Sequence, residues 1–230
     1  MYRTKQESIA VAGIADLQIR SLLDRQQYHD PLHRAERLGI SSAAWPIFGL
    51  LWPSGAQLAA RMAARTLRPN ERILEIGCGL ALPSLVAHRR GADVTASDHH
   101  PLAAGFLRHN LRLNHLSPMK YRVGNWQRPE RRTGPAPRGY DLIVGSDVLY
   151  ERDPQGDLAA MIDRHAGRGS EVWIVDPDRG NRAQFNRHMR ANGFDCREER
   201  LDRRAFAGEA AYRGRLLVYR RIDAACDGAY

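Results

Sequence analysis

The sequence predicts an α/β fold: a seven-stranded, mostly parallel sheet with helices on both faces, plus a small N-terminal hairpin. Short apolar runs of strand length alternate along the chain with segments whose apolar residues recur at helical spacing. This alternation is typical of parallel strands joined by right-handed crossovers. The chain has 230 residues, of which 43% are hydrophobic and 27% charged, so it can form one packed domain.

The central feature of the sequence is the stretch 72–83, which reads RILEIGCGLALP. Its apolar run at 73–76 predicts a buried strand, and the spacing of apolar residues from Leu82 predicts a helix that ends at Gly91. Gly77 and Gly79 form the turn between them. Without a Cβ in the way, a ligand can lie close to this backbone, and the free amides of the helix start favour electron-rich groups.

The residue types of this turn separate two cofactor classes. A dinucleotide site has the pattern G-x-G-x-x-G, but Leu82 stands where the third glycine is needed. S-adenosylmethionine carries an ammonium and a sulfonium group, which suit an acid on the strand before the turn, and Glu75 is such an acid. The turn therefore favours S-adenosylmethionine over a dinucleotide. A strand, turn and helix without any ligand is the remaining alternative.

The chain before this turn is expected to hold a hairpin, a cover segment and one helix. Residues 8–12 and 15–20 alternate as two strands around Gly13. Ser54 is expected to cap a helix that stops near Pro69. Trp52 belongs to one of two Trp-Pro pairs, and it either closes over the cofactor or packs in the core. We expect domain limits of 1–43 for hairpin and cover, 44–221 for the main domain and 222–230 for a tail.

Polar residues follow the predicted strands of the main domain. The second strand, 92–98, ends on Asp98, 19 residues after Gly79, where an acid accepts hydrogen bonds from ribose hydroxyls. His99 next to it is expected to line the site. The third strand, 121–126, ends with an asparagine for the adenine amino edge and a tryptophan that could cover the ring; these are Asn125 and Trp126.

The remaining strands are expected at 140–150, 171–179, 195–201 and 215–220, with a loop at 127–139. Ligands bind at the carboxyl ends of parallel strands. Five polar residues fall at such ends, and they predict a site along one edge of the sheet: Glu75, Asp98, Asn125, Asp147 and Asp176. The alternative for each residue alone is that it caps the next helix.

These residues together resemble the family-16 branch of the class I, Rossmann-like methyltransferases, which is known mainly for protein-lysine methylation. The resemblance runs from about residue 44 to residue 220. It rests on the glycine turn and on these segments: LWPSG at 51–55, Ser97 with Asp98, Asn110, Asn114, Asn125 with Trp126, and the D-x-x-Y signature at 147–150. The segment DPDR at 176–179 looks like the DPGR of electron-transfer-flavoprotein lysine methyltransferases, with Asp178 in place of glycine. Ala81 likewise replaces the last glycine of the turn motif.

The resemblance implies that S-adenosylmethionine is the cofactor and that a protein lysine is the substrate. It implies catalytic roles for Asp147, which would orient the incoming amine, and for Tyr150, which would line the channel. It also implies a cofactor-binding edge made of Trp52, Glu75, Gly77, Gly79, Asp98, His99, Asn125, Trp126 and Ser146. Asn125 departs from the aspartate of many members. The alternative for the two catalytic positions is that Asp147 caps a helix and Tyr150 packs in the core.

The substrate class has alternatives. A net charge of +9 suits nucleic acid or an acidic partner, and the runner-up is a methyltransferase that acts on RNA or a small molecule. The segment SDVLY at 146–150 lacks the N/D-P-P-Y/F of enzymes that methylate base amines. Enzymes that attack pyrimidine C5 need a nucleophilic cysteine near the site, but Cys78 lies in the glycine turn, and Cys196 and Cys226 lie far along the chain. A non-catalytic cofactor-binding protein and an NAD-dependent oxidoreductase are further alternatives.

The sequence favours neither a metal site nor a membrane span. Pro31 separates His29 from His33, so the two do not share a helical face. No apolar run approaches the roughly 18 residues needed to cross a bilayer, and the N-terminus lacks the apolar stretch of a signal peptide. Three cysteines without close pairing are typical of a reducing compartment, so we expect the protein in the cytoplasm.

Overall fold

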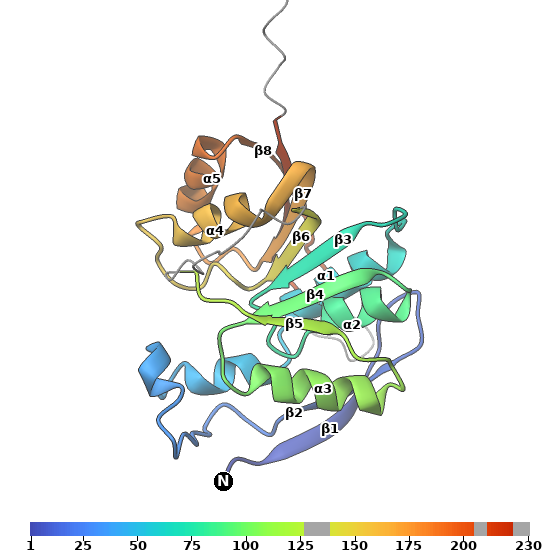
Figure 1. Cartoon of the computed structure of the whole chain (residues 1–230), viewed down its shortest axis with the longest axis vertical. Coiled ribbons are helices and arrows are strands. Elements are labelled where there is room, and N and C mark those ends of the chain that lie inside the picture. The colour runs from blue at the N-terminus through green and yellow to red at the C-terminus, as the bar shows by residue number, and fades with distance from the viewer. Residues whose placement is uncertain (127–138, 205–210, 223–230) are drawn as a thin grey trace, which may run out of the picture.

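The computed structural model describes residues 1–126, 139–204 and 211–222 (Figure 1). The expected loop at 127–139, apart from Gly139, lies outside the described residues. So do Cys226 and, from residue 223 on, the expected tail.

The core of the fold is the predicted seven-stranded sheet, in the order β5-β4-β3-β6-β7-β9-β8. Its strands are β3 Arg72–Ile76, β4 Asp93–Asp98, β5 Lys120–Val123, β6 Tyr140–Ser146, β7 Ala166–Asp176, β8 Phe194–Arg200 and β9 Arg215–Arg221. The first five run parallel, and β9 pairs antiparallel with both β7 and β8. The prediction of a mostly parallel sheet is confirmed.

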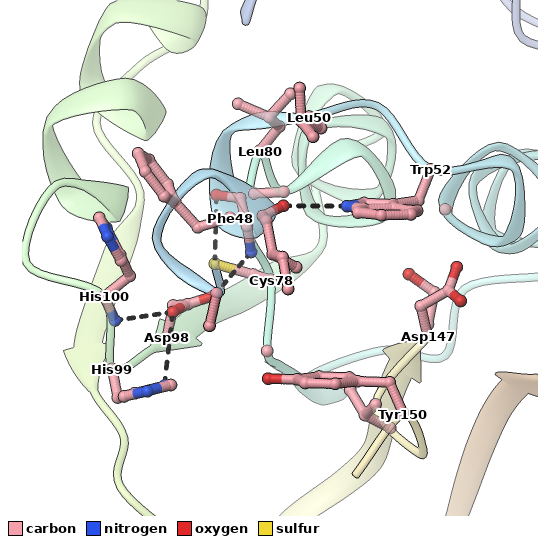
Figure 2. Close-up of a pocket in the computed structure, with 18 of the residues that line it drawn as sticks. Phe48, Leu50, Trp52, Cys78, Leu80, Asp98, His99, His100, Asp147 and Tyr150 are labelled. Atoms are coloured by element: carbon pink, nitrogen blue, oxygen red, sulfur yellow. Dashed lines mark hydrogen bonds and ion pairs between the residues drawn. The ribbon is translucent and has the colours of Figure 1, made fainter. Parts of the chain in front are cut away.

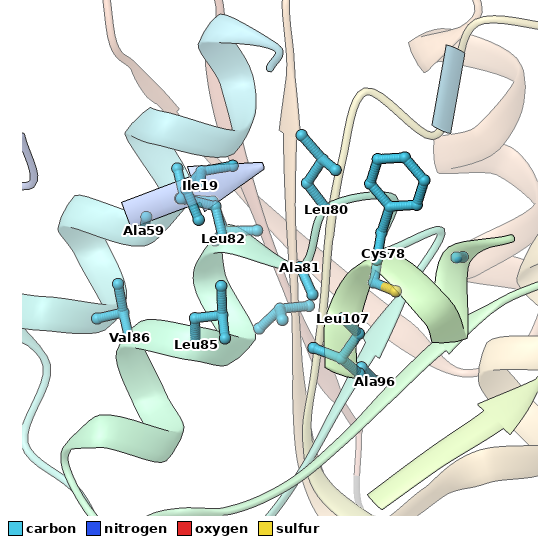
Figure 3. Packing of buried hydrophobic residues seen from close by; sticks show 14 of the residues in the cluster. Ile19, Ala59, Cys78, Leu80, Ala81, Leu82, Leu85, Val86, Ala96 and Leu107 are labelled. Atoms are coloured by element: carbon cyan, nitrogen blue, oxygen red, sulfur yellow. The ribbon is translucent and has the colours of Figure 1, made fainter. Parts of the chain in front are cut away.

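Helices cover both faces of this sheet (Figure 1). They are α1 Pro53–Ala64, α2 Leu82–Arg89, α3 Ala103–Leu113, α4 Asp157–His165 and α5 Arg182–Ala191. Successive strand residues alternate between the faces: Ile73 packs in the cluster with α1, α2 and α3, and Leu74 in the cluster with α4 and α5. Figure 3 shows the first cluster around Leu85 and Val86 of α2. Burial on both faces explains why these strands are apolar runs rather than alternating patterns.

The N-terminal hairpin exists, but its predicted bounds are wrong. Strand β1 is Thr4–Ile9 and β2 is Leu17–Leu22, and they pair antiparallel from Thr4↔Leu22 to Ile9↔Leu17. Residues 10–16 are the connection, with a turn at Gly13 (φ 85°). Leu17 and Ile19 are fully buried, so packing on the main domain, rather than local alternation, sets where the second strand begins.

The expected cap of α1 is also wrong. The helix begins at Pro53 after Trp52, without a side-chain cap, and ends at Ala64 rather than near Pro69. Proline suits the first helical position because its missing N–H would have no partner there. The Ser54 hydroxyl instead forms a buried hydrogen bond of 3.0 Å with the hydroxyl of Tyr212, which ties α1 to the segment before β9.

Two asparagines, Asn110 of α3 and Asn114 directly after its last residue, fasten the hairpin to the domain. The Asn110 side chain accepts the N–H of Arg20 at 2.9 Å and donates to its carbonyl at 3.3 Å. Asn114 makes the same pair of bonds with Gln18, at 2.9 and 2.7 Å. The amides sit at i and i+4 of the helix, and they match alternate residues of the strand, so they act as a substitute neighbouring strand for the open edge of β2.

Replacing Asn110 with alanine should therefore lower the free energy of unfolding by about 1–3 kcal/mol, because the backbone groups of Arg20 lose their partners. Urea denaturation measures this change. Asn192→Ala is the control, since its side chain makes no hydrogen bond in the described residues. Equal stability of Asn110→Ala and the wild type would contradict the fastening role.

Candidate active site

The candidate site lies where the strand order reverses. After β3, the strands β4 and β5 are added on one side of β3. The chain then returns to the other side of β3, where it adds β6 and then β7. Ligands of open α/β sheets bind at the carboxyl ends next to such a switch point. A cavity of about 290 Å³ lies there, near the lower end of the roughly 300–1,000 Å³ of small-molecule sites. Its walls come from the loops after β3, β4, β5 and β6 and from residues 38–55.

The glycine turn after β3 forms the floor of the cavity. Gly77 and Gly79 have φ values of 57° and 50°, a left-handed conformation that favours glycine. A Cβ on Gly79 would lie 2.8 Å from the carbonyl oxygen of Phe48, and one on Gly77 would lie 2.9 Å from a methyl of Val148. Ala81 also has a left-handed φ of 60°, which explains why a glycine is usual at this position of the motif.

Glu75 lies beneath this turn, and its carboxylate borders the cavity. It is only 1% exposed and accepts the N–H of Ser84 at the start of α2, at 2.9 Å. Burial raises the pKa of Glu75 to about 8 against the hydrogen bond from the Ser84 N–H, and the nearby charge of Asp98 adds to the rise. The carboxyl is therefore mostly protonated at neutral pH, and a cation bound next to it would favour the charged form.

Asp98 lies at the end of β4 and faces the same cavity (Figure 2). Its two oxygens accept the N–H groups of Gly79 and His100, both at 2.8 Å. Each carboxylate oxygen has a second lone pair, so both can also accept a bond from a ligand hydroxyl. His99 lines the cavity next to Asp98, with Nδ1 3.9 Å from the carboxylate.

Aromatic rings close the sides of the cavity. His100 stacks on Phe48 with 3.7 Å between ring centroids, and burial lowers the pKa of His100 to about 3, so this ring is neutral. Asn125 and Trp126 follow β5 and also line the cavity. The third predicted strand therefore ends at Val123, short of these two residues, because they turn toward the site.

Trp52 lines the cavity from the start of α1. Its indole N–H donates to the carbonyl of Ile47 at 2.9 Å. The guanidinium carbons of Arg25 and Arg179 lie 4.7 and 5.7 Å from the ring centroid, within the range of cation–π attraction. These contacts hold the indole in one orientation at the mouth of the cavity.

The opposite end of the cavity from Asp98 carries Asp147 and Tyr150 (Figure 2). Strand β6 ends at Ser146, which also lines the cavity, and Asp147 turns away with φ 56°. Oδ1 of Asp147 accepts a hydrogen bond from Arg179 at 2.7 Å. Burial raises the pKa of Tyr150 to about 12, and the charges of Glu151 and Asp98 add to the rise, so its hydroxyl stays protonated at neutral pH.

All eleven site residues predicted from the sequence line this one cavity. Asp176, the fifth polar strand end, does not line it: it is 1% exposed at the end of β7. Several features of the cavity were not predicted from the sequence: the ion pair of Arg179, the wall residues Phe48 and Glu151, and the segment 38–40. Of these, only Arg179 belongs to a recognisable motif, the DPDR segment, that could have indicated a place in the site.

The described residues show neither a metal cluster nor a membrane helix. No three His, Cys, Asp or Glu side chains in them gather closely enough to hold a metal ion. No helix in the same part of the chain has the length and apolar character to cross a membrane.

The sequence matches a family model described as lysine methyltransferase over residues 43–190, more than half of the chain. The chain belongs to this lysine methyltransferase family. It is 31% identical over 146 residues to an electron transfer flavoprotein beta subunit lysine methyltransferase of Xenopus laevis, with 62% of this chain and 56% of that protein covered. It is 30% identical over 115 residues to the histone-arginine methyltransferase METTL23 of Rattus norvegicus, with 49% and 51% covered. The chain thus spans about half the length of these curated relatives.

A solved structure supports the fold. The magnesium protoporphyrin IX methyltransferase of Synechocystis, crystallised with bound SAM, is 20% identical with a TM-score of 0.54, and the match covers 73% of this chain and 78% of that one. Membership of the lysine methyltransferase family makes S-adenosylmethionine the cofactor of this chain. The residues of the cavity fit it: two glycines that a Cβ would block, a buried acid for a cation, and Asp98 for the ribose.

Glu75 should make the stability of the ligand-free protein depend on pH. The unfolded carboxyl loses its proton near 4.5 and the folded one near 8. Between these values the folded state binds more protons, so the free energy of unfolding falls as the pH rises. Urea denaturation across this range should show a shallower fall for Glu75→Gln than for the wild type. Equal slopes for the two proteins would contradict the buried, protonated state of Glu75.

Proposed function

We propose that this protein transfers the methyl group of S-adenosylmethionine to the side-chain amine of a protein lysine. The observation that carries the proposal is the division of the cavity. Asp98 lies at one end, where a ribose would bind, and Asp147 and Tyr150 lie at the other end, after β6. Membership of the family supports a lysine as the acceptor, and the more similar of the two relatives above methylates lysine.

Asp147 is suited to orient the amine. Arg179 occupies Oδ1, whereas Oδ2 has no hydrogen-bond partner in the described residues. We infer that Oδ2 accepts an N–H of the incoming amine and so aims the nitrogen lone pair into the cavity. The ion pair with Arg179 fixes the carboxylate, and such positioning is the main contribution a protein can make to a displacement reaction.

The amine must enter without its extra proton. A free lysine has a pKa of about 10.4, and an apolar, aromatic passage disfavours the ammonium form. Trp52, Val148 and Tyr150 line such a passage, so we infer that the proton leaves to solvent as the side chain enters. When bound, S-adenosylmethionine would supply a methyl carbon on its sulfonium, and S-adenosylhomocysteine would be the leaving group as the N–C bond forms and the S–C bond breaks.

Methylation of RNA at pyrimidine C5 is a weaker candidate, because it requires a cysteine thiolate. Cys78 borders the cavity, but burial, together with the charge of Asp98, raises the pKa of its thiol well above the ordinary value. A thiol in this state is a poor nucleophile.

We place the reaction in the cytoplasm, which is supported by the sparse cysteines of the sequence.

The proposal is tested by incubating the protein with radiolabelled S-adenosylmethionine and a demethylated cell extract, with nuclease in one arm and protease in another. We expect the label to survive nuclease, to be lost with protease, and to be recovered as methyl-lysine after hydrolysis. Label in nucleic acid would overturn the proposal. Label in methyl-arginine would also overturn it and would indicate arginine methylation, the activity of its relative METTL23.

In the same assay, Asp147→Asn should lose at least about a hundredfold in turnover, because the amide is a weaker acceptor and a weaker partner for Arg179. Its affinity for S-adenosylhomocysteine should stay within about threefold, as measured by calorimetry. Tyr150→Phe is the matched comparison and should lose less, since its ring still lines the passage. Full turnover of Asp147→Asn would end the role assigned to this carboxylate.

A further inference from the structure

The positive charge of the sequence is concentrated in one segment. Residues 179–221 contain 12 arginines, no lysine and 5 acids, so they carry most of the net charge of +9. The segment begins at Arg179, which lines the cavity. A charge distribution this uneven points to a surface with a purpose beyond solubility.

The topology brings part of this segment to the edge of the sheet that carries the site. Strand β9 runs antiparallel to β7, so Arg215 at its start pairs with Asp176 at the carboxyl end of β7. Arg200, at the end of β8, pairs with Arg215. Residues 201–204 and 211–214, the described parts of the connection between β8 and β9, therefore lie at the same edge of the sheet as the cavity. The hydrogen bond between Tyr212 and Ser54 ties residue 212 to α1.

Some charges at this edge are balanced. Asp178 accepts bonds from Arg182, from Arg200 at 3.0 Å and from Arg215 at 3.0 Å. Glu198 and Asp202 add further acidic partners to these arginines. Three acids thus compensate three arginines, and this cluster contributes no excess charge.

Other arginines have no such compensation. Arg204 and Arg213 lie exposed on the connection, and in the described residues neither has an acidic partner. At Trp52, which lines the cavity, exposed Arg25 lies over the indole ring and also lacks an acidic partner in the described residues. We call Arg25, Arg204 and Arg213 the basic rim.

The substrate end of the cavity carries an acid without a compensating cation. Asp147 and exposed Glu151 both line this end. Asp147 is paired with Arg179, whereas Glu151 has no cationic partner in the described residues. A cationic side chain is attracted to Glu151, whereas a nucleic-acid backbone would place phosphates near it. An acid beside a basic rim is complementary to a lysine that has acidic residues on either side.

We propose that the methylated lysine lies in an acidic segment of the substrate protein, whose carboxylates bind the basic rim while the lysine enters between Asp147 and Tyr150. This inference rests on the proposed function and names its substrate class. The rim contacts are exposed and screened by salt, so they should act mainly on the encounter and on KM rather than on the transfer step.

Three synthetic peptides test the inference, each with one central lysine and flanked by aspartates, serines or arginines. We expect a KM for the aspartate peptide at least about tenfold below that of the serine peptide at low salt, with the difference shrinking as salt rises. The arginine peptide should be the poorest substrate. Arg204→Glu/Arg213→Glu should abolish the preference for aspartate flanks with kcat and cofactor affinity unchanged.

The control is Arg187→Glu/Arg190→Glu, which makes the same change in charge on the last turns of α5, at the opposite edge of the sheet. This control variant should keep the preference for aspartate flanks.

Equal KM values for the aspartate and serine peptides, or an equal loss of that preference in both double variants, would overturn the inference but leave the proposed function intact. Stronger competition by an RNA oligomer than by poly-aspartate would assign the rim to RNA. Absence of transfer to every lysine, in peptides and in extract proteins, would overturn the proposed function itself.

Discussion

The site depends on one carboxylate, that of Asp98. By accepting the N–H of Gly79 at 2.8 Å, it joins the end of β4 to the glycine turn after β3. The N–H of Cys78 donates to the carbonyl of Ser97 at 3.0 Å and makes a second link between β4 and the glycine turn. These bonds hold the turn in the left-handed conformation that only glycine adopts without cost. In this conformation no side chain stands above the backbone of the two glycines, and the cavity lies in the space above them.

The rest of the structure extends the cavity toward the substrate. Because β3 and β6 are neighbours whose connections lead in opposite directions, the loops after them diverge, and Asp147 faces Asp98 across the gap. The hairpin, fastened by Asn110 and Asn114, leads to Arg25, which lies over Trp52. A segment distant in sequence from the sheet thereby helps to shape the mouth.

The sequence was informative where backbone conformation or sheet topology requires a particular residue. Gly77 and Gly79 could be placed because no other residue tolerates their surroundings, and the polar strand ends could be placed because parallel strands bring them to one edge. Ala81 adopts the same left-handed conformation, with φ 60°, and its Cβ makes this conformation less favourable than it is for glycine. Asp178 does so as well, with φ 59°, at the position where the DPGR segment that it resembles has glycine.

Interactions between distant segments could not be predicted in this way. Ser54 looked like a helix cap, yet its hydroxyl bonds Tyr212, 158 residues away. The bounds of the hairpin depend on burial against α3, and local alternation does not report that contact. The partner of Asp147 is Arg179, and a sequence shows both charges without showing that they meet.

The proposed roles of the cavity residues depend on the orientation of the cofactor, which a crystal structure with bound S-adenosylhomocysteine would show. We expect ribose hydroxyls within hydrogen-bond distance of Asp98, about 2.5–3.0 Å, the amino group next to Glu75, and the sulfur directed toward Asp147 and Tyr150. A ligand whose ribose lies at Asp147, with the sulfur directed toward Asp98, would overturn these roles.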